Sequence, residues 1–112
     1  MMAALLILVS VAAFGTPYPG ATLATPPEPT SCGLRYHFTT HDPEAKVAAY
    51  YRAQAAASGA NATIGKGGPD IPDYLPMLFT RDAHHSMMVI LDRKDGLTTG
   101  AVVVNARVGG GC

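Results

Sequence analysis

Apolar and polar residues alternate along residues 34–40, where Leu34, Tyr36 and Phe38 fall on one side. A period of two is typical of a strand with one face buried and the other in water, so we predict a strand there. Similar apolar stretches recur in the second half of the chain and are separated by turn residues. The further strands that they predict cover residues 60–64, 75–81, 86–91 and 97–107, with turns at 82–85 and 92–96.

An alanine-rich segment between the first two predicted strands has helical character and extends to Ser58. At its start, Asp42 is placed to cap the free amides and Pro43 suits the first helical position, while Gly59 is a typical C-terminal stop. Its larger side chains recur at helical spacing along one narrow stripe, which we expect to cover one face of a sheet. The stripe contains Val47, Tyr50, Tyr51, Gln54 and Ser58.

The predicted order of elements is a strand, a helix and then an antiparallel meander. This order is typical of the α+β class, and we expect one helix packed on a mostly antiparallel sheet, β-α-β-β-β, in a two-layer sandwich. We place this single small α+β domain at residues 32–112. The preceding residues 16–31 hold five of the nine prolines and are expected to form an extended tether or a strap along the domain surface.

Residues 3–14 form an apolar run without a charged side chain. The run is too short to span a bilayer and ends in small residues, which is typical of the core of an export signal. We therefore predict a signal peptide at residues 1–15, cleaved before Thr16 or, as a second candidate, after Ala13. The protein is then periplasmic or secreted, and not an integral membrane protein after cleavage. The amino terminus is the only positive charge in this stretch. Two alternatives therefore stay open: the segment is an uncleaved anchor, or it is a buried element of a cytosolic protein.

Composition narrows the classes of partner. The chain has eight Lys and Arg residues and eight Asp and Glu residues, so its formal net charge is zero. Nucleic-acid binders and proteins that bind anionic membranes need a basic surface, and we expect neither kind of partner. The length that remains after the predicted leader allows one small domain, which would gain from an additional constraint on its unfolded chain.

Two cysteines, Cys32 and Cys112, bracket the predicted domain. If the first and last strands pair antiparallel, the two cysteines lie near each other, and the glycines before Cys112 supply the slack that disulfide geometry needs. In an oxidising compartment we expect them to form a disulfide. Free or intermolecular thiols, and a redox or metal-binding pair, are the alternatives.

The candidate metal ligands are Asp82, His84 and His85, which share one predicted turn. Imidazole suits zinc and copper, but adjacent residues on a strand point to opposite faces, so we expect ordinary surface histidines. Ser86 lacks the Gly-x-Ser-x-Gly frame of many hydrolases, and residues 65–67 lack the full pattern of a phosphate loop. We therefore expect no catalytic residue, no cofactor and no enzymatic activity.

Apolar side chains on the predicted strands suggest a partner surface. Four of them are expected to share the second face of the sheet: Met88, Ile90, Val102 and Val104. If the proline-rich strap does not cover this face, they form an exposed apolar patch, which suits a protein partner or a homo-oligomer. The pairs at residues 50–51 and 87–88 are expected to belong to the core rather than to a ligand pocket.

Tyr18-Pro19-Gly20-Ala21 follows the leader, and Thr40-x-Asp42 precedes Val47-x-x-Tyr50-Tyr51 at the junction of the first strand and the helix. In these two patterns the chain resembles a loosely defined group of small exported bacterial proteins of unassigned function. The resemblance covers residues 18–21 and 34–60 and implies export and a β-α-β-β unit. Members often carry Gly-Trp after the helix, where this chain has Gly59-Ala60. The resemblance carries over no catalytic or binding residue.

Together these features predict a small exported cell-envelope protein that acts as a non-enzymatic binding or interaction module, with its ligand or partner unassigned. The alternative is a small-ligand or metal-binding periplasmic protein. It would use either the turn that contains His84 and His85 or the groove between the helix and the sheet.

Overall fold

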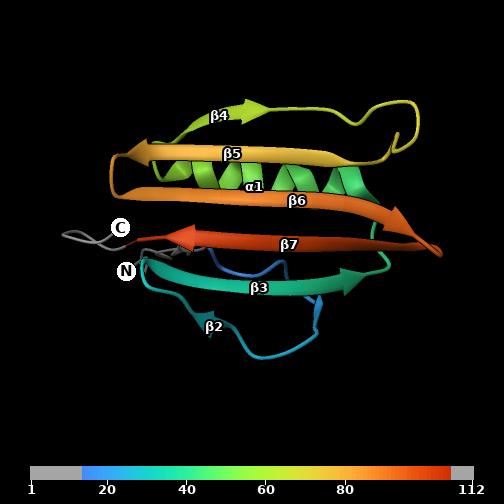
Figure 1. The fold of residues 1–112 in the computed structure, drawn as a ribbon, viewed down its shortest axis with the longest axis horizontal. Coiled ribbons are helices and arrows are strands. Elements are labelled where there is room, and N and C mark those ends of the chain that lie inside the picture. Colours follow the sequence, from blue (N-terminus) through green and yellow to red (C-terminus); the bar gives the residue numbers. More distant parts are fainter. Residues whose placement is uncertain (1–13, 107–112) are drawn as a thin grey trace, which may run out of the picture.

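The computed structural model describes residues 14–106 of the chain. In this part, one helix, α1 (Glu44–Ala57), packs on an antiparallel sheet (Figure 1). The sheet order is β1-β3-β7-β6-β5-β4, and β2 also pairs with β3. The predicted α+β fold, with one helix on a mostly antiparallel sheet, is confirmed. The strands are β1 (Thr22–Leu23), β2 (Glu28–Pro29), β3 (Gly33–Thr40), β4 (Asn61–Ile64), β5 (Leu75–Asp82), β6 (His85–Lys94) and β7 (Leu97–Asn105).

The first and last long strands, β3 and β7, are antiparallel neighbours near the middle of the sheet, as Figure 1 shows. Their register pairs Tyr36 with Val102 and Phe38 with Gly100. The Phe38 ring lies over Gly100, where an added Cβ would come within 2.2 Å of the ring. A glycine is therefore needed at this pair, because any side chain would displace the ring from the core.

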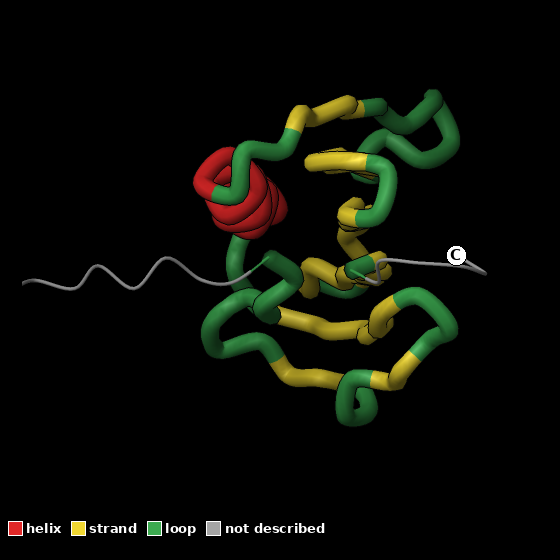
Figure 2. Tube along the Cα trace, turned by 90° about the vertical axis from the view of Figure 1, so that its left-hand side faces the viewer, coloured by secondary structure: helices red, strands yellow, loops and turns green. Residues whose placement is uncertain are grey.

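Helix α1 lies on one side of the curved sheet, and no described helix lies on the other (Figure 2). Alternate residues of each long strand point to the helix side and are buried there, as the period of two in the sequence predicts. In β6 these are Met87, Val89 and Leu91. The remaining core side chains are Tyr18, Tyr36, Phe38, Val47, Ala48, Tyr51, Ala55, Met77, Phe79, Val102 and Val104.

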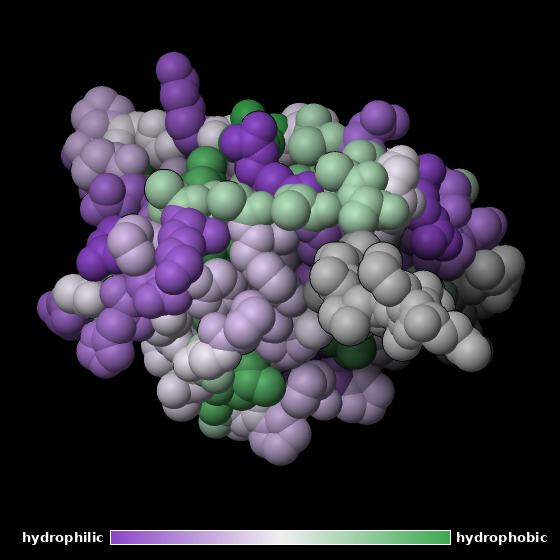
Figure 3. Space-filling model, turned by 180° about the vertical axis from the view of Figure 1, so that it is seen from behind, coloured by the Kyte–Doolittle hydropathy of each residue, from purple (hydrophilic) through white to green (hydrophobic). Residues whose placement is uncertain are grey.

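The outer side of α1 faces away from the sheet and is rich in exposed alanine, which forms a pale green band in the view from behind (Figure 3). The buried side of the helix carries the residues that its spacing predicts, among them Val47, Tyr51 and Gln54. Helix α1 therefore forms a single layer on the sheet, with its larger apolar side chains turned inward.

The two ends of α1 differ in how well the sequence predicts them. Gly59 is the C-terminal stop as expected: it has φ +78°, and its N–H and that of Ala60 donate to carbonyls of the last helical turn. The prediction that Asp42 caps the other end is wrong, because Pro43 is the capping residue and no side chain bonds the free amides. The Asp42 carboxylate instead accepts a hydrogen bond from Tyr18.

The proline-rich residues 16–31 lie along the outer edge of β3 in the structure. Thr22 of β1 pairs with Thr39, and Glu28 of β2 pairs with Arg35. Arg35 and Glu28 also form an ion pair at 3.1 Å between Nη2 and Oε2. This segment therefore supplies strand partners to β3, and it covers an edge that would otherwise offer unpaired backbone groups.

Candidate functional site

The two sequence patterns that the resemblance singled out lie far apart in the chain but meet in the structure. The Tyr18 hydroxyl donates to Asp42 Oδ2 at 2.5 Å, and the Tyr18 N–H donates to the Tyr51 hydroxyl at 3.1 Å. The Tyr18 ring packs edge-on against Tyr50, with 5.4 Å between ring centroids. The hydrogen bond to the Asp42 carboxylate raises the pKa of Tyr18 to about 12, so this hydroxyl remains a donor at neutral pH.

Next to these contacts, buried polar side chains form hydrogen bonds with the backbone that precedes Tyr18. The Gly15 N–H donates to Gln54 Oε1 at 2.6 Å, and the Gly15 carbonyl accepts from the Tyr36 hydroxyl at 3.0 Å. The hydroxyls of Tyr36 and Tyr51 are also hydrogen-bonded to each other, at 3.0 Å. We call the three side chains of Tyr36, Tyr51 and Gln54 the cradle.

The cradle is a structural device and not an acid–base pair. Burial raises the pKa of Tyr36 and raises the pKa of Tyr51 to about 12, so both phenols stay protonated at neutral pH. Gln54 has no charge and uses both ends of its amide, since its Nε2 donates to the Thr16 carbonyl at 3.0 Å. These groups satisfy the backbone of residues 15–18 inside the fold.

An open groove of about 510 Å³ lies beside Tyr18, between α1 and the segment that precedes β1. None of its lining residues belongs to a strand, so it is not the predicted groove between the helix and the sheet. Tyr18, Asp42 and Tyr50 contribute to its walls, together with Lys46, whose Nζ lies 3.7 Å from Asp42 Oδ2. The carboxylate is therefore already engaged by a phenol and by an ammonium group. The groove offers a ligand mainly aromatic and proline surface, with few unused polar groups.

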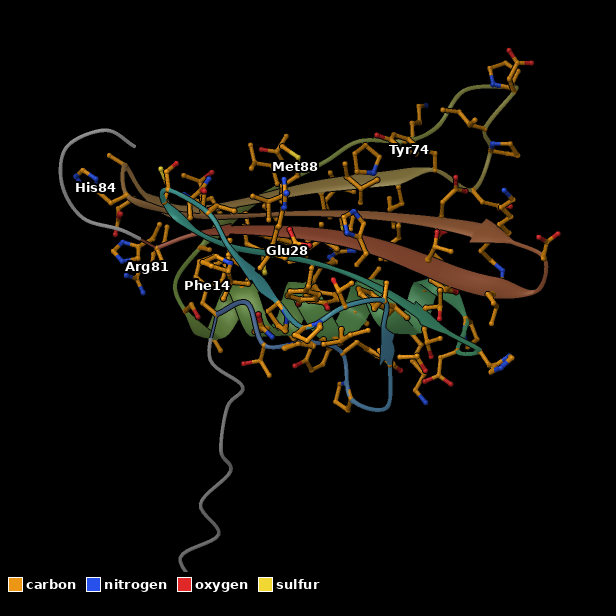
Figure 4. The ribbon with its side chains drawn as sticks, turned by 60° about the horizontal axis from the view of Figure 1, so that its bottom comes forward. Phe14, Glu28, Tyr74, Arg81, His84 and Met88 are labelled. Carbon is orange, nitrogen blue, oxygen red and sulfur yellow. The ribbon has the colours of Figure 1, made fainter. Side chains whose placement is uncertain are left out.

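The turn between β5 and β6 brings two of the three candidate metal ligands together. Asp82 accepts a hydrogen bond at 2.8 Å from His85 Nδ1 to its Oδ1, and another at 2.8 Å from the backbone N–H of His84. These two bonds lower the pKa of Asp82 to about 2. The side chain of His84 lies at the tip of the hairpin (Figure 4). Within residues 14–106, no group of three His, Cys, Asp or Glu side chains is arranged to hold a metal ion.

The sheet face opposite α1 has an apolar centre, which we call the open face. Leu78, Met88 and Val103 are consecutive cross-strand neighbours on β5, β6 and β7, and their side chains are 38%, 44% and 38% exposed. Figure 4 shows Met88 and Tyr74 projecting on this side, and Phe14 on the side of α1. Thr63 on β4 and Arg35 on β3 continue the same row on either side.

Two of the four residues predicted for this apolar patch lie on the other face of the sheet. Met88 lies on the open face, but Val102 and Val104 point to the helix side and are buried. The prediction treated residues 92–96 as the turn, whereas the loop consists of Asp95 and Gly96 alone, both with positive φ. A turn at 92–96 would pair residue 91 with residue 97, whereas Leu91 pairs with Gly100 in the structure. The register therefore differs by three residues, and an odd shift exchanges the two faces of a strand. The Asp95-Gly96 pair was the signal that identifies Val103 as the neighbour of Met88.

The predicted pairing of Cys32 with Cys112 lies partly outside the described residues, because Cys112 is not among them. The described part brings the end of β7 to Cys32: Asn105 pairs with Gly33, and the Ala106 N–H donates to the Cys32 carbonyl at 2.9 Å. The disulfide remains a prediction. This geometry supports it, since only five residues separate Ala106 from Cys112.

Comparison of the chain with protein family models, with curated proteins and with solved structures finds no match in any of the three. None of the helices within residues 14–106 combines the length and the apolar character needed to cross a membrane. The case for a function therefore depends on the residues and their arrangement alone.

Proposed function

We propose that this protein is an exported, non-enzymatic interaction module that binds another protein through the open face of its sheet. The observation that carries this proposal is the uncharged row of Leu78, Met88 and Val103, exposed across three neighbouring strands. Contiguous exposed apolar side chains on a small protein are typical of interaction surfaces.

The surroundings of this row support a protein partner. Half-buried Ile90 and Ala101 continue the apolar centre, while polar Ser86 and Asn105 lie at one end and charged Asp92 lies at the other. An apolar centre with a polar rim is the usual anatomy of a protein–protein interface. The balanced charge of the whole chain agrees with a partner that is not strongly charged.

The hollows on the open face are small and open to solvent. One of about 220 Å³ lies between Leu78, Met88 and Pro76, and one of about 300 Å³ lies beside Ile90 and Tyr74. Hollows of this size on the surface of a sheet fit single side chains of a partner. The strands beneath them are paired on both sides, so the surface is rigid before binding and little ordering entropy is lost.

Photo-crosslinking in the cell envelope tests the proposal. A photoreactive phenylalanine analogue in place of Met88 is expected to give a crosslinked product of discrete mass. The same analogue in place of Ala53, on the exposed outer side of α1, is the matched control and is expected to give none. Adding Val103→Glu to the Met88 probe should abolish the product. Equal crosslinking from both positions, or a product unaffected by Val103→Glu, would contradict binding through the open face.

A further inference from the structure

Gly15, which the sequence prediction assigns to the leader, is built into the folded domain. It is buried, its N–H donates to Gln54 Oε1 at 2.6 Å, and its carbonyl accepts from the Tyr36 hydroxyl at 3.0 Å. Gln54 is only 3% exposed and Tyr36 only 1%. Both polar ends of this one residue are therefore satisfied by groups in the interior of the fold.

The space around Gly15 admits no larger residue. Its φ is +95°, a conformation that side chains disfavour, and an added Cβ would lie 2.7 Å from Val104 Cγ2. Phe14, immediately before it, packs against the core on the side of α1. A residue of a discarded leader has no reason to be fitted so closely to a strand and two core side chains.

Cleavage before Thr16 would remove these contacts from the mature protein. Gln54 Oε1 would lose its donor inside the fold, and the space that Gly15 fills beside Val104 would be empty. A buried acceptor without a partner and a new void both lower the free energy of unfolding. Cleavage two residues earlier keeps every one of these contacts.

We infer that the export signal ends at Ala13 and that the mature protein begins at Phe14. Val11 and Ala13 then occupy the third and first positions before the cut, where leader peptidases accept small uncharged residues. Water hydrolyses the peptide bond between Ala13 and Phe14, leaving a carboxylate on Ala13 and an ammonium group on Phe14. The inference rests on the proposed export, and it assigns the processing site that export requires.

The intact mass of the exported protein, expressed with its own leader in a bacterial host, tests the inference. A chain that starts at Phe14 is the expected result. A chain that starts at Thr16 is lighter by one phenylalanine and one glycine residue, and it overturns the processing site while leaving export in place. A full-length chain retained inside the cell overturns the proposed export itself, so the two failures are distinguishable.

A pair of leader variants tests which bond is cut. Val11→Gln puts a large polar residue three positions before the bond after Ala13, and it leaves Ala13 and Gly15 in place for a cut before Thr16. The inference expects Val11→Gln to reduce release of the Phe14 form at least tenfold. Ser10→Gln, which alters neither pair of cleavage positions, is the matched control and should be processed normally. Unchanged processing of Val11→Gln would overturn the inference.

Stability provides a readout that does not depend on the peptidase. Two purified chains, one starting at Phe14 and one at Thr16, differ only in Phe14, which packs against the core, and in Gly15, which the cradle binds. We expect the shorter chain to have a Tm lower by about 5–15 °C, because it lacks the buried hydrogen bonds and leaves a void. Equal Tm values would show that Gly15 does not contribute to the mature fold, and would overturn the inference.

Discussion

The two faces of the sheet are made by alternate residues of the same strands, yet they differ in what lies on them. On the helix side, Met87 is fully buried under α1, while its neighbour Met88 on the other side is 44% exposed. Polar groups that reach the helix side, such as Gln54 and the tyrosine hydroxyls, are hydrogen-bonded inside the fold. The helix side therefore holds the fold together, whereas the apolar side chains of the open face stay exposed within the described residues.

The largest expected effect comes from placing a charge on the buried face of β7. Val102→Lys puts an ammonium group into the core, where Val102 is 1% exposed, and an unpaired buried charge costs several kcal/mol. Since small domains have a total stability of about 5–15 kcal/mol, we expect this variant to be largely unfolded.

Val103→Lys, one residue further, is the matched control for that charge. It places the same ammonium group on the open face, so we expect a change within about 0.5 kcal/mol. Circular dichroism and urea unfolding measure both variants. A folded, stable Val102→Lys protein would show that the assignment of the two faces is wrong.

Truncation of the two adjacent methionines is the next largest effect. Met87→Ala removes a fully buried side chain and leaves a cavity, which is expected to lower the free energy of unfolding by about 2–5 kcal/mol. Met88→Ala is expected to change it by less than about 0.5 kcal/mol. Chemical denaturation of the two variants gives both values, and equal losses would contradict the asymmetry between the faces.

A smaller loss is expected from a single hydroxyl of the cradle. Tyr51→Phe removes the acceptor of the Tyr18 N–H and the partner of the Tyr36 hydroxyl, and the free energy of unfolding should fall by about 1–3 kcal/mol. Tyr74→Phe, on the open side of the sheet, keeps the ring and should be near neutral. If thermal unfolding shows the two variants to be equivalent, the cradle does not stabilise the fold.

The smallest effect is expected from Asp82, in the exposed turn between β5 and β6. Asp82 has a pKa of about 2 in the folded protein, below its usual value of 3.8, because His85 and the His84 N–H favour the carboxylate. A lowered pKa stabilises the folded state above the unfolded pKa, and this stabilisation disappears as the pH falls through 2. Asp82→Asn should therefore lower Tm slightly at pH 6 and by much less at pH 2. A difference in Tm that is independent of pH would exclude this carboxylate as its source.

Much of the fold follows from local sequence. The alternation of Leu34, Tyr36 and Phe38 identifies β3 and its buried side, and Gly59 ends α1 because only glycine readily adopts the required φ. The Asp95-Gly96 pair would also have predicted the register of β6 and β7, since a two-residue turn with positive φ determines which residues face each other. Assigning a longer turn moved Val102 and Val104 to the wrong face.

Local sequence was enough to predict α1, the strands β3 to β7 and the residue types available to a core, but not the short strands β1 and β2. The partners that those residues meet across the chain could be read only from the folded arrangement. Asp42 bonds Tyr18 instead of capping α1, and Gly15 bonds Gln54 across 39 positions. Such pairings depend on how the proline-rich segment docks onto the helix and sheet. Local propensity does not predict this packing, because the hydrogen bonds between the segment and the rest of the domain form only once both have folded.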